Sequence, residues 1–303
     1  MLSWTLSLVV FGGLYGLLAL GLNVIWGMGG MVNLGLAGFF ALGAYASALV
    51  TVAGAPIPLG VLLAMAVAGL AGGLLSRLTL TLRGDYLAIV TLGFAELVRL
   101  IAANEIWLTN GSDGIPGVPG PWRGALTPLE FNALFAVIAV GCAGLVWWMT
   151  ERLRRSPWGR ALRALREDET AAAVAGKRVR RLKVEAFALG AGVLGLAGAL
   201  YAHYTSYVAP DIFRPLLTIY IFLALTAGGA GNPAGAVLGA AAVVVVLEGS
   251  RFVEPLIPGL SGAQGAAIRE IVIGSALILV MRIRPGGLLA ERPPRPYAPE
   301  ARA

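Results

Sequence analysis

The sequence predicts an all-α, polytopic membrane protein with about nine transmembrane helices (eight to ten), each of about 20 residues. Three features carry this prediction. Hydrophobic residues make up 58% of the 303 residues and charged residues only 13%, whereas soluble domains contain about 25% charged residues. The mean hydropathy is +0.81. Glycine accounts for 42 residues, and small residues such as Ala191, Gly195 and Ala199, spaced four apart, let membrane helices pack closely.

Apolar segments follow one another along residues 1–290, which we interpret as a single transmembrane domain. The segments lie near residues 3–26, 31–52, 57–76, 86–103, 130–149, 185–207, 216–228, 234–250 and 268–283. The seventh is short and ends in TAGGAGNPAG, so it is expected to be broken or re-entrant. The first lacks a small-residue cleavage pattern and is expected to be retained rather than removed as a signal peptide. Residues 291–303 are expected to form a flexible cytoplasmic tail.

Basic residues concentrate in one long connection, residues 151–184, which contains 11 Lys and Arg but 4 Asp and Glu. Because Lys and Arg accumulate in cytoplasmic loops, this loop is predicted to face the cytoplasm. Counting spans from it places residues 104–129 and the N-terminus outside, and the C-terminus inside. The net charge of +7 fits contact with membrane lipid better than with nucleic acid.

The long cytoplasmic loop divides into two predicted helices. Ser156 and Pro157 form a typical helix start, and Trp158, Leu162 and Leu165 then fall on one face. The neighbouring face is basic, which predicts a helix lying on the lipid headgroups. The basic face consists of Arg160, Arg163 and Arg166.

A second, exposed helix is predicted over residues 167–176. Its acidic first turn complements the positive end of the helix dipole, an alanine-rich run follows, and Gly176 is a typical stop. Such a helix offers a smooth surface for docking into a groove of another protein; a plain solvated connection is the alternative. The residues assigned to docking are Glu167, Asp168, Glu169, Thr170, Ala171, Ala172, Ala173 and Gly176.

Six segments, in order along nearly the whole chain, carry a family resemblance. They are NLGLAGFFALGAY, LRGDYLAIVTLGFAELVRL, TNGSDGIPGVPGP, SPWGRALRALREDETAAAVAG, LAGALYAHYTSYVAPDIF and GGAGNPAGAVLGA. Together they resemble the ABC importer permeases for branched-chain amino acids, and the LivM type more than its LivH-type partner. Within them, TAAAVAG (Thr170 to Gly176) resembles the EAA-x3-G coupling motif, with threonine in place of the leading glutamate.

The resemblance implies a five-part assembly in a bacterial-type cytoplasmic (inner) membrane. This chain would pair with a second, LivH-like permease chain as a heterodimer, two ABC ATPase subunits would attach at the cytoplasmic face, and an external binding protein would deliver the substrate. The sequence has no G-x-x-x-x-G-K-[ST] phosphate loop, so ATP and Mg are expected on partner subunits and no cofactor on this chain. With one cysteine and one histidine, it is expected to be a transport subunit without metal, disulfide or catalytic residues.

Candidates for the translocation path are polar residues in or between the spans. Asn23 and Asn33 flank WGMGG and are expected either to cap the chain or to line the path. Glu96 and Arg99 are expected to pair within one helix, with a structural role preferred over a functional one. The path candidates are Asn23, Asn33, Tyr45, Thr91 and Glu96.

The outer loop contains NGSDGIPGVPGP, which is rich in turn formers and has three prolines. We expect it to dock the external binding protein through Ser112, Asp113, Gly114, Ile115 and Pro116; a plain loop is the alternative. Near the outer end of a later span, His203, Tyr204 and Tyr207 are expected to form an interfacial aromatic belt in preference to lining the path.

Two functions of different classes remain open. The leading one is an ABC importer permease for branched-chain or other hydrophobic amino acids, with urea or short-chain amides as the alternative substrate. The other class is a stand-alone channel or secondary transporter, against which the predicted docking helix argues.

Overall fold

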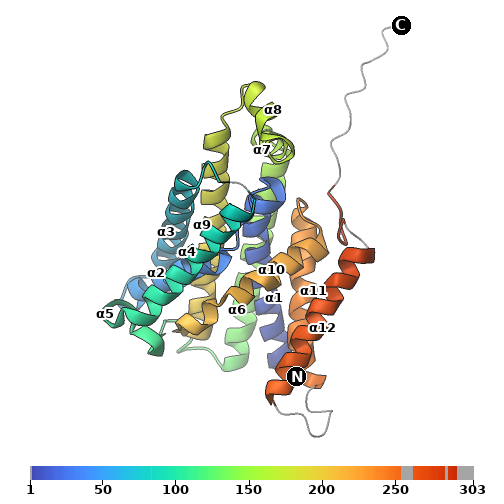
Figure 1. Cartoon of the computed structure of the whole chain (residues 1–303). Coiled ribbons are helices and arrows are strands. Elements are labelled where there is room, and N and C mark those ends of the chain that lie inside the picture. Colours follow the sequence, from blue (N-terminus) through green and yellow to red (C-terminus); the bar gives the residue numbers. More distant parts are fainter. Residues whose placement is uncertain (1, 83, 254–261, 284–285, 292–303) are drawn as a thin grey trace.

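The computed structural model describes residues 2–82, 84–253, 262–283 and 286–291, and they are almost entirely helical. Figure 1 shows the long helices side by side, with α7 and α8 at one end of the molecule and α5 at the other. The longer helices are α1 (Leu2–Leu22), α2 (Leu36–Val52), α3 (Ile57–Leu78), α4 (Asp85–Asn104), α6 (Pro128–Arg155), α9 (Val179–Thr205), α10 (Pro215–Gly228), α11 (Pro233–Val253) and α12 (Gly262–Ile283).

Each of the nine predicted segments coincides with one of these helices, which confirms the all-α class. In the described part of the chain, five helices are long and apolar enough to cross a membrane, namely Leu2–Met28, Ile57–Leu78, Asp85–Asn104, Pro128–Arg155 and Val179–Thr205. Three more apolar helices are shorter. The structure is therefore consistent with a multi-pass membrane protein, while nine crossings and the orientation remain predictions.

The boundary between the first two spans differs from the prediction. The first helix continues beyond residue 26 as a π-helical segment, Asn23–Met28, and the second begins at Leu36 rather than near residue 31. A turn at Gly30 (φ 69°) separates them. The Asn33 Oδ1 accepts a hydrogen bond from Gly35 N (2.9 Å). The side chain therefore supplies the hydrogen-bond partner that this buried backbone N–H needs ahead of the helix.

Helix α9 lies at the centre of the bundle, against α1, α2 and α3. Its small residues permit this: Ala191 and Ala199 are fully buried, as the four-residue spacing predicted. At Gly198 an added Cβ would overlap the carbonyl oxygen of Phe40, and at Gly43 it would overlap the backbone of Gly195. Helices α2 and α9 therefore approach backbone to backbone.

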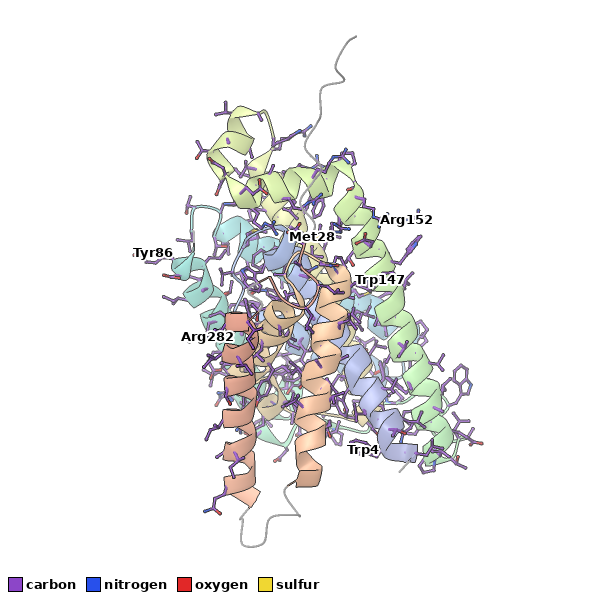
Figure 2. The ribbon with its side chains drawn as sticks, turned by 90° about the vertical axis from the view of Figure 1, so that its right-hand side faces the viewer. Trp4, Met28, Tyr86, Trp147, Arg152 and Arg282 are labelled. Atoms are coloured by element: carbon purple, nitrogen blue, oxygen red, sulfur yellow. The ribbon has the colours of Figure 1, made fainter. Side chains whose placement is uncertain are left out.

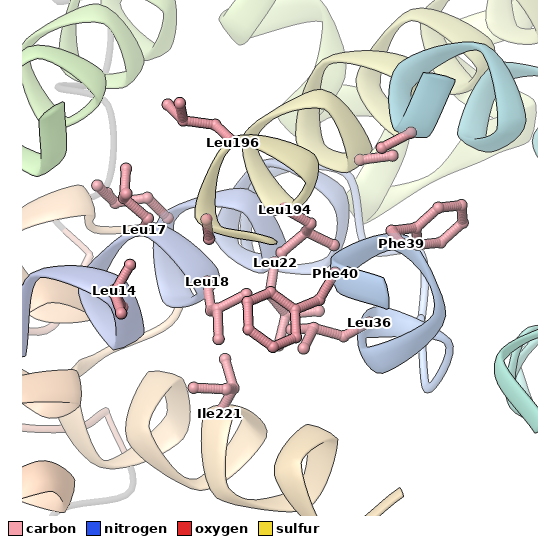
Figure 3. Close-up of a cluster of buried hydrophobic side chains, with 14 of the residues drawn as sticks. Leu14, Leu17, Leu18, Leu22, Leu36, Phe39, Phe40, Leu194, Leu196 and Ile221 are labelled. Atoms are coloured by element: carbon pink, nitrogen blue, oxygen red, sulfur yellow. The ribbon is translucent and has the colours of Figure 1, made fainter. Parts of the chain in front are cut away.

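A cluster of large apolar side chains fills the space beside this contact (Figure 3). The cluster is contributed by α1, α2, α9 and α10 and includes Leu14, Leu17, Leu18, Leu22, Leu36, Phe39, Phe40, Leu194, Leu196 and Ile221. Burying such a side chain contributes about 1.5–3 kcal/mol in water; within a membrane the gain comes mainly from close packing.

Candidate functional site

The predicted docking region forms a compact hairpin of two short helices, α7 (Pro157–Glu167) and α8 (Glu169–Val174), at one end of the bundle (Figure 1). The start of α7 is as predicted, because the Ser156 Oγ accepts from Gly159 N (3.2 Å) and Pro157 takes the first helical position. Leu162 and Leu165 are buried, which confirms the apolar face.

Helix α8 is shorter than the predicted 167–176. Glu167 is the last residue of α7, and Asp168 is an N-cap whose Oδ1 accepts from Thr170 N (2.8 Å) and Ala171 N (3.0 Å). The carboxylate satisfies the first free N–H groups, so the helix restarts only after it. Gly176 has a φ of 75° and ends the segment, as predicted.

Small side chains cover the outer surface of α8. Thr170, Ala171, Ala173 and Val174 are exposed, Val174 by 85%, whereas Ala172 is only 4% exposed and packs against the chain itself. The Glu169 carboxylate accepts from Lys183 Nζ (2.8 Å), which fastens α8 to α9. The helix is therefore held in place while one small, smooth face stays free for a partner.

A cleft with a volume of about 760 Å³ opens beside α8, between it and the connection from α3 to α4. It is lined by Arg77, Leu78, Leu80, Thr81, Glu169, Thr170, Ala173, Val179, Arg180 and Lys183. The exposed face of α8 therefore continues into a recess that is partly apolar and contains three basic side chains, Arg77, Arg180 and Lys183.

The basic face of α7 does not point as predicted. Of its three arginines, Arg160 is exposed, but Arg163 and Arg166 turn into the protein and pair with Glu291 (3.5 and 2.7 Å). Their side chains are 14% and 27% exposed, and that of Glu291 is 16% exposed. The expectation that the whole basic face lies on lipid headgroups is therefore wrong for Arg163 and Arg166, because both pair with one carboxylate of the same chain.

Four of the five path candidates lie inside the chain. Asn23, Asn33 and Thr91 are fully buried, and Tyr45 is 6% exposed. The Thr91 Oγ1 accepts from Leu34 N (3.0 Å), so it supports the same turn that Asn33 caps. The Nδ2 atoms of both asparagines and the hydroxyl of Tyr45 have no hydrogen-bond partner among the described residues. The capping alternative for Asn33 is thus realised in this structure.

Glu96, the fifth candidate, forms the predicted pair with Arg99 on α4. The Arg99 Nε donates to Glu96 Oε2 (2.9 Å), and the two side chains are 37% (Glu96) and 22% (Arg99) exposed. The ion pair lies on a helix whose remaining surface is largely apolar and outward-facing, so it is open to a neighbouring molecule rather than to the interior of this chain.

The outer loop is more ordered than a plain connection. Ile115–Pro116 (β1) pairs antiparallel with Tyr207–Val208 (β2), and Tyr207 donates to the carbonyl oxygen of Asp113 (2.8 Å). Ser112, Asp113 and Pro116 are exposed, but Gly114 and Ile115 are buried. Only three of the five predicted docking residues, Ser112, Asp113 and Pro116, are therefore available to a partner in this structure.

His203 was expected in an aromatic belt but is 1% exposed. Its Nε2 lies 2.8 Å from Ser47 Oγ and its Nδ1 lies 2.7 Å from the carbonyl oxygen of Pro119. The ring therefore ties the outer loop to α2. No sequence signal pointed to this, since its partners are 156 and 84 residues away.

The π-helical segment and the start of α1 lie toward opposite ends of the molecule. Figure 2 places Met28, at the end of the π-helical segment, near the same end as Arg152, while Trp4 lies at the opposite end. Arg152 lies over the Trp148 ring (4.3 Å to its centroid).

Within the described residues, no three His, Cys, Asp or Glu side chains could hold a metal ion together.

The comparisons with known proteins cover nearly the whole chain. The family model for the branched-chain amino acid transport system permease component matches residues 4–281. The high-affinity branched-chain amino acid transport system permease protein LivM of Escherichia coli (strain K12) is 34% identical, over 94% of this chain and 70% of its own length. The probable LivM of Methanocaldococcus jannaschii is 28% identical over 94% and 93%. LivH of Escherichia coli (strain K12) is 24% identical over 93% and 92%. No solved structure matches the chain.

Proposed function

The chain belongs to the branched-chain amino acid transport permease family, and from this premise we propose that it is the membrane-spanning subunit of an ATP-driven importer. The substrate is a branched-chain or other hydrophobic amino acid, delivered by an external binding protein. The observation that carries the proposal is α8: a short capped helix, fastened to the bundle by Glu169 and Lys183 (2.8 Å), with an exposed face of small side chains.

The ATPases of this proposal dock on α8 and the cleft beside it. Small side chains let a partner's groove approach the α8 backbone closely, and the exposed Val174 adds an apolar contact. Arg77 and Arg180 line the cleft and favour an acidic surface on the partner. ATP and Mg are bound by those partners, and this chain contributes no catalytic residue.

The second permease chain of the proposal is LivH-like. Relatives of both the LivM and the LivH type match this chain, which supports two related permeases in one system. Helix α4 presents an apolar outer surface, with Leu97, Leu100 and Ile101 each at least 45% exposed. The partly exposed ion pair of Glu96 and Arg99 lies on the same helix. A facing permease chain would enclose the path against this surface.

Transport in proteoliposomes tests the proposal. The complete assembly is reconstituted with its ATPases facing the vesicle lumen, which contains ATP, and with the binding protein outside. Radiolabelled leucine and urea are then supplied from outside in parallel experiments. We expect leucine uptake that needs both ATP and the binding protein. ATP-driven uptake of urea without leucine would replace the substrate class, and uptake by this chain alone without ATP would replace the importer with a channel.

A further inference from the structure

Glu291 links four segments that are far apart in the sequence. Its carboxylate accepts from Arg166 Nη2 (2.7 Å) and lies 3.5 Å from Arg163 Nη1, both on α7. The second terminal nitrogen of Arg166 donates to the carbonyl oxygen of Gly27 in the π-helical segment of the first helix. Gly231, in the turn between α10 and α11, lies so close to Glu291 that an added Cβ would overlap the carboxylate.

Residues 286–291, here called the strap, are themselves attached to the end of α10. Leu288 N donates to the carbonyl oxygen of Ala227 (2.8 Å) and Leu289 N to that of Gly228 (2.9 Å). Asn232 Nδ2 donates to the carbonyl oxygen of Leu289 (3.2 Å). The strap therefore moves with α10 and its following turn, while its terminal carboxylate holds α7.

Charge makes this contact responsive to displacement. Three charged side chains, each less than 30% exposed, lie together, and separating them would leave a charge in a poorly solvated place. Among the described residues, the Nε of Arg163 and the Oε1 of Glu291 have no hydrogen-bond partner, so these donors and acceptors can also be arranged in another way. A π-helical segment inside a longer helix is frequently located at a functional site.

We propose that Glu291 is the residue through which movement of the α7 and α8 hairpin reaches the end of α10 and the turn that follows it. This rests on the proposed function, because it assigns the ATPases as the source of that movement. Arg166 carries displacement to Gly27 directly, and Glu291 carries it through the strap to the turn at Gly231. Glu291 acts as a positioning residue and makes no contact with the substrate.

The test is Glu291→Gln in the complete assembly, with the amount of substrate moved per ATP hydrolysed as the readout. Removing the charge while keeping the shape should lower this ratio at least fivefold, at the low end of the ~5–150-fold range typical of coupling between sites, while ATP hydrolysis persists. Glu291→Asp should restore part of the ratio. The matched control is Glu151→Gln: Glu151 also holds two arginines, Arg154 and Arg155 (both 2.7 Å), but within one helix.

An unchanged ratio in Glu291→Gln overturns the proposal, and so does an equal fall in Glu151→Gln, which would indicate a general effect of lost ion pairs. If Glu291→Gln is not recovered as an assembly, Arg163→Gln decides in its place, with the same expected loss of transport per ATP and the same overturning result. Failure of the proposed function is distinguishable, because the unaltered assembly would then show no ATP-driven uptake at all.

Discussion

Asn23 and Gly231 lie 208 residues apart in the chain and are joined by a hydrogen bond, in which Gly231 N donates to Asn23 Oδ1 (2.8 Å). Asn23 is fully buried at the start of the π-helical segment. Gly27, one turn later, has no side chain, and an added Cβ there would overlap the Asn23 amide oxygen. The first helix is thereby fixed to the turn that follows α10.

Replacing Asn23 with leucine should destabilise the protein by about 1–3 kcal/mol, because Gly231 N would lose its partner in a buried place. The midpoint of thermal unfolding in detergent measures the effect. Asn132→Leu is the control, since the Asn132 amide donates to Ser3 Oγ (3.1 Å) at an exposed position and its loss should change stability by less than about 0.5 kcal/mol. Equal midpoints for the two variants would contradict the anchoring role of Asn23.

The contact between α2 and α9 predicts a sharp difference between glycines. Gly198→Ala should cost about 1–3 kcal/mol, since the new methyl group would overlap the Phe40 carbonyl oxygen and force the helices apart. A methyl group at Gly141, in the middle of α6, would meet none of the described residues within 4 Å, so Gly141→Ala should leave stability unchanged or raise it. Thermal unfolding and the yield of monodisperse protein measure both, and a harmless Gly198→Ala would show that the helices do not meet as closely as described.

The features that the sequence predicted correctly are those whose partners are local. Ser156 caps a backbone group three residues away, Gly176 ends a helix through its own backbone angle, and Glu96 pairs with Arg99 one turn along the same helix. The apolar segments were predictable for the same reason, because the length and composition of a segment decide whether it can cross a membrane.

The features that were missed depend on which segments meet in three dimensions. Arg163 and Arg166, on a loop predicted to be cytoplasmic, fit lipid headgroups by pattern, and only the packing of the strap brings Glu291 to them. His203 is likewise positioned by partners in α2 and the outer loop. A periodic pattern records burial and polarity along one helix, but not the choice of partner for a buried polar group.

The predicted orientation is open to direct labelling. In a background with Cys142 replaced by serine, single cysteines at Ser112 and Thr170 test opposite ends of the molecule, and both positions are exposed in the structure. We expect a membrane-impermeant maleimide to label Ser112→Cys on whole cells and to label Thr170→Cys only after the membrane is opened. Labelling of Thr170→Cys alone on whole cells would mean an inverted topology, and the ATPase proposal would fail with it.

The docking surface on α8 gives the last prediction. Bulk must be tested on the exposed face: Ala173 is exposed, whereas Ala172 is 4% exposed, so a large residue at Ala172 would disturb the permease's own packing. Ala173→Trp should block the close approach of the ATPase groove, and loss of one well-packed contact of this kind weakens binding by at least about 2 kcal/mol, or roughly 30-fold. Recovery of the ATPases with the tagged permease, together with uptake, measures the effect.

The control is Ala125→Trp, an equal increase in bulk on the exposed outer loop, which should leave ATPase recovery unchanged. Full ATPase recovery with Ala173→Trp would show that the partner binds elsewhere, and the cleft beside α8, with Arg77 and Arg180 in its wall, would then be the next surface to alter.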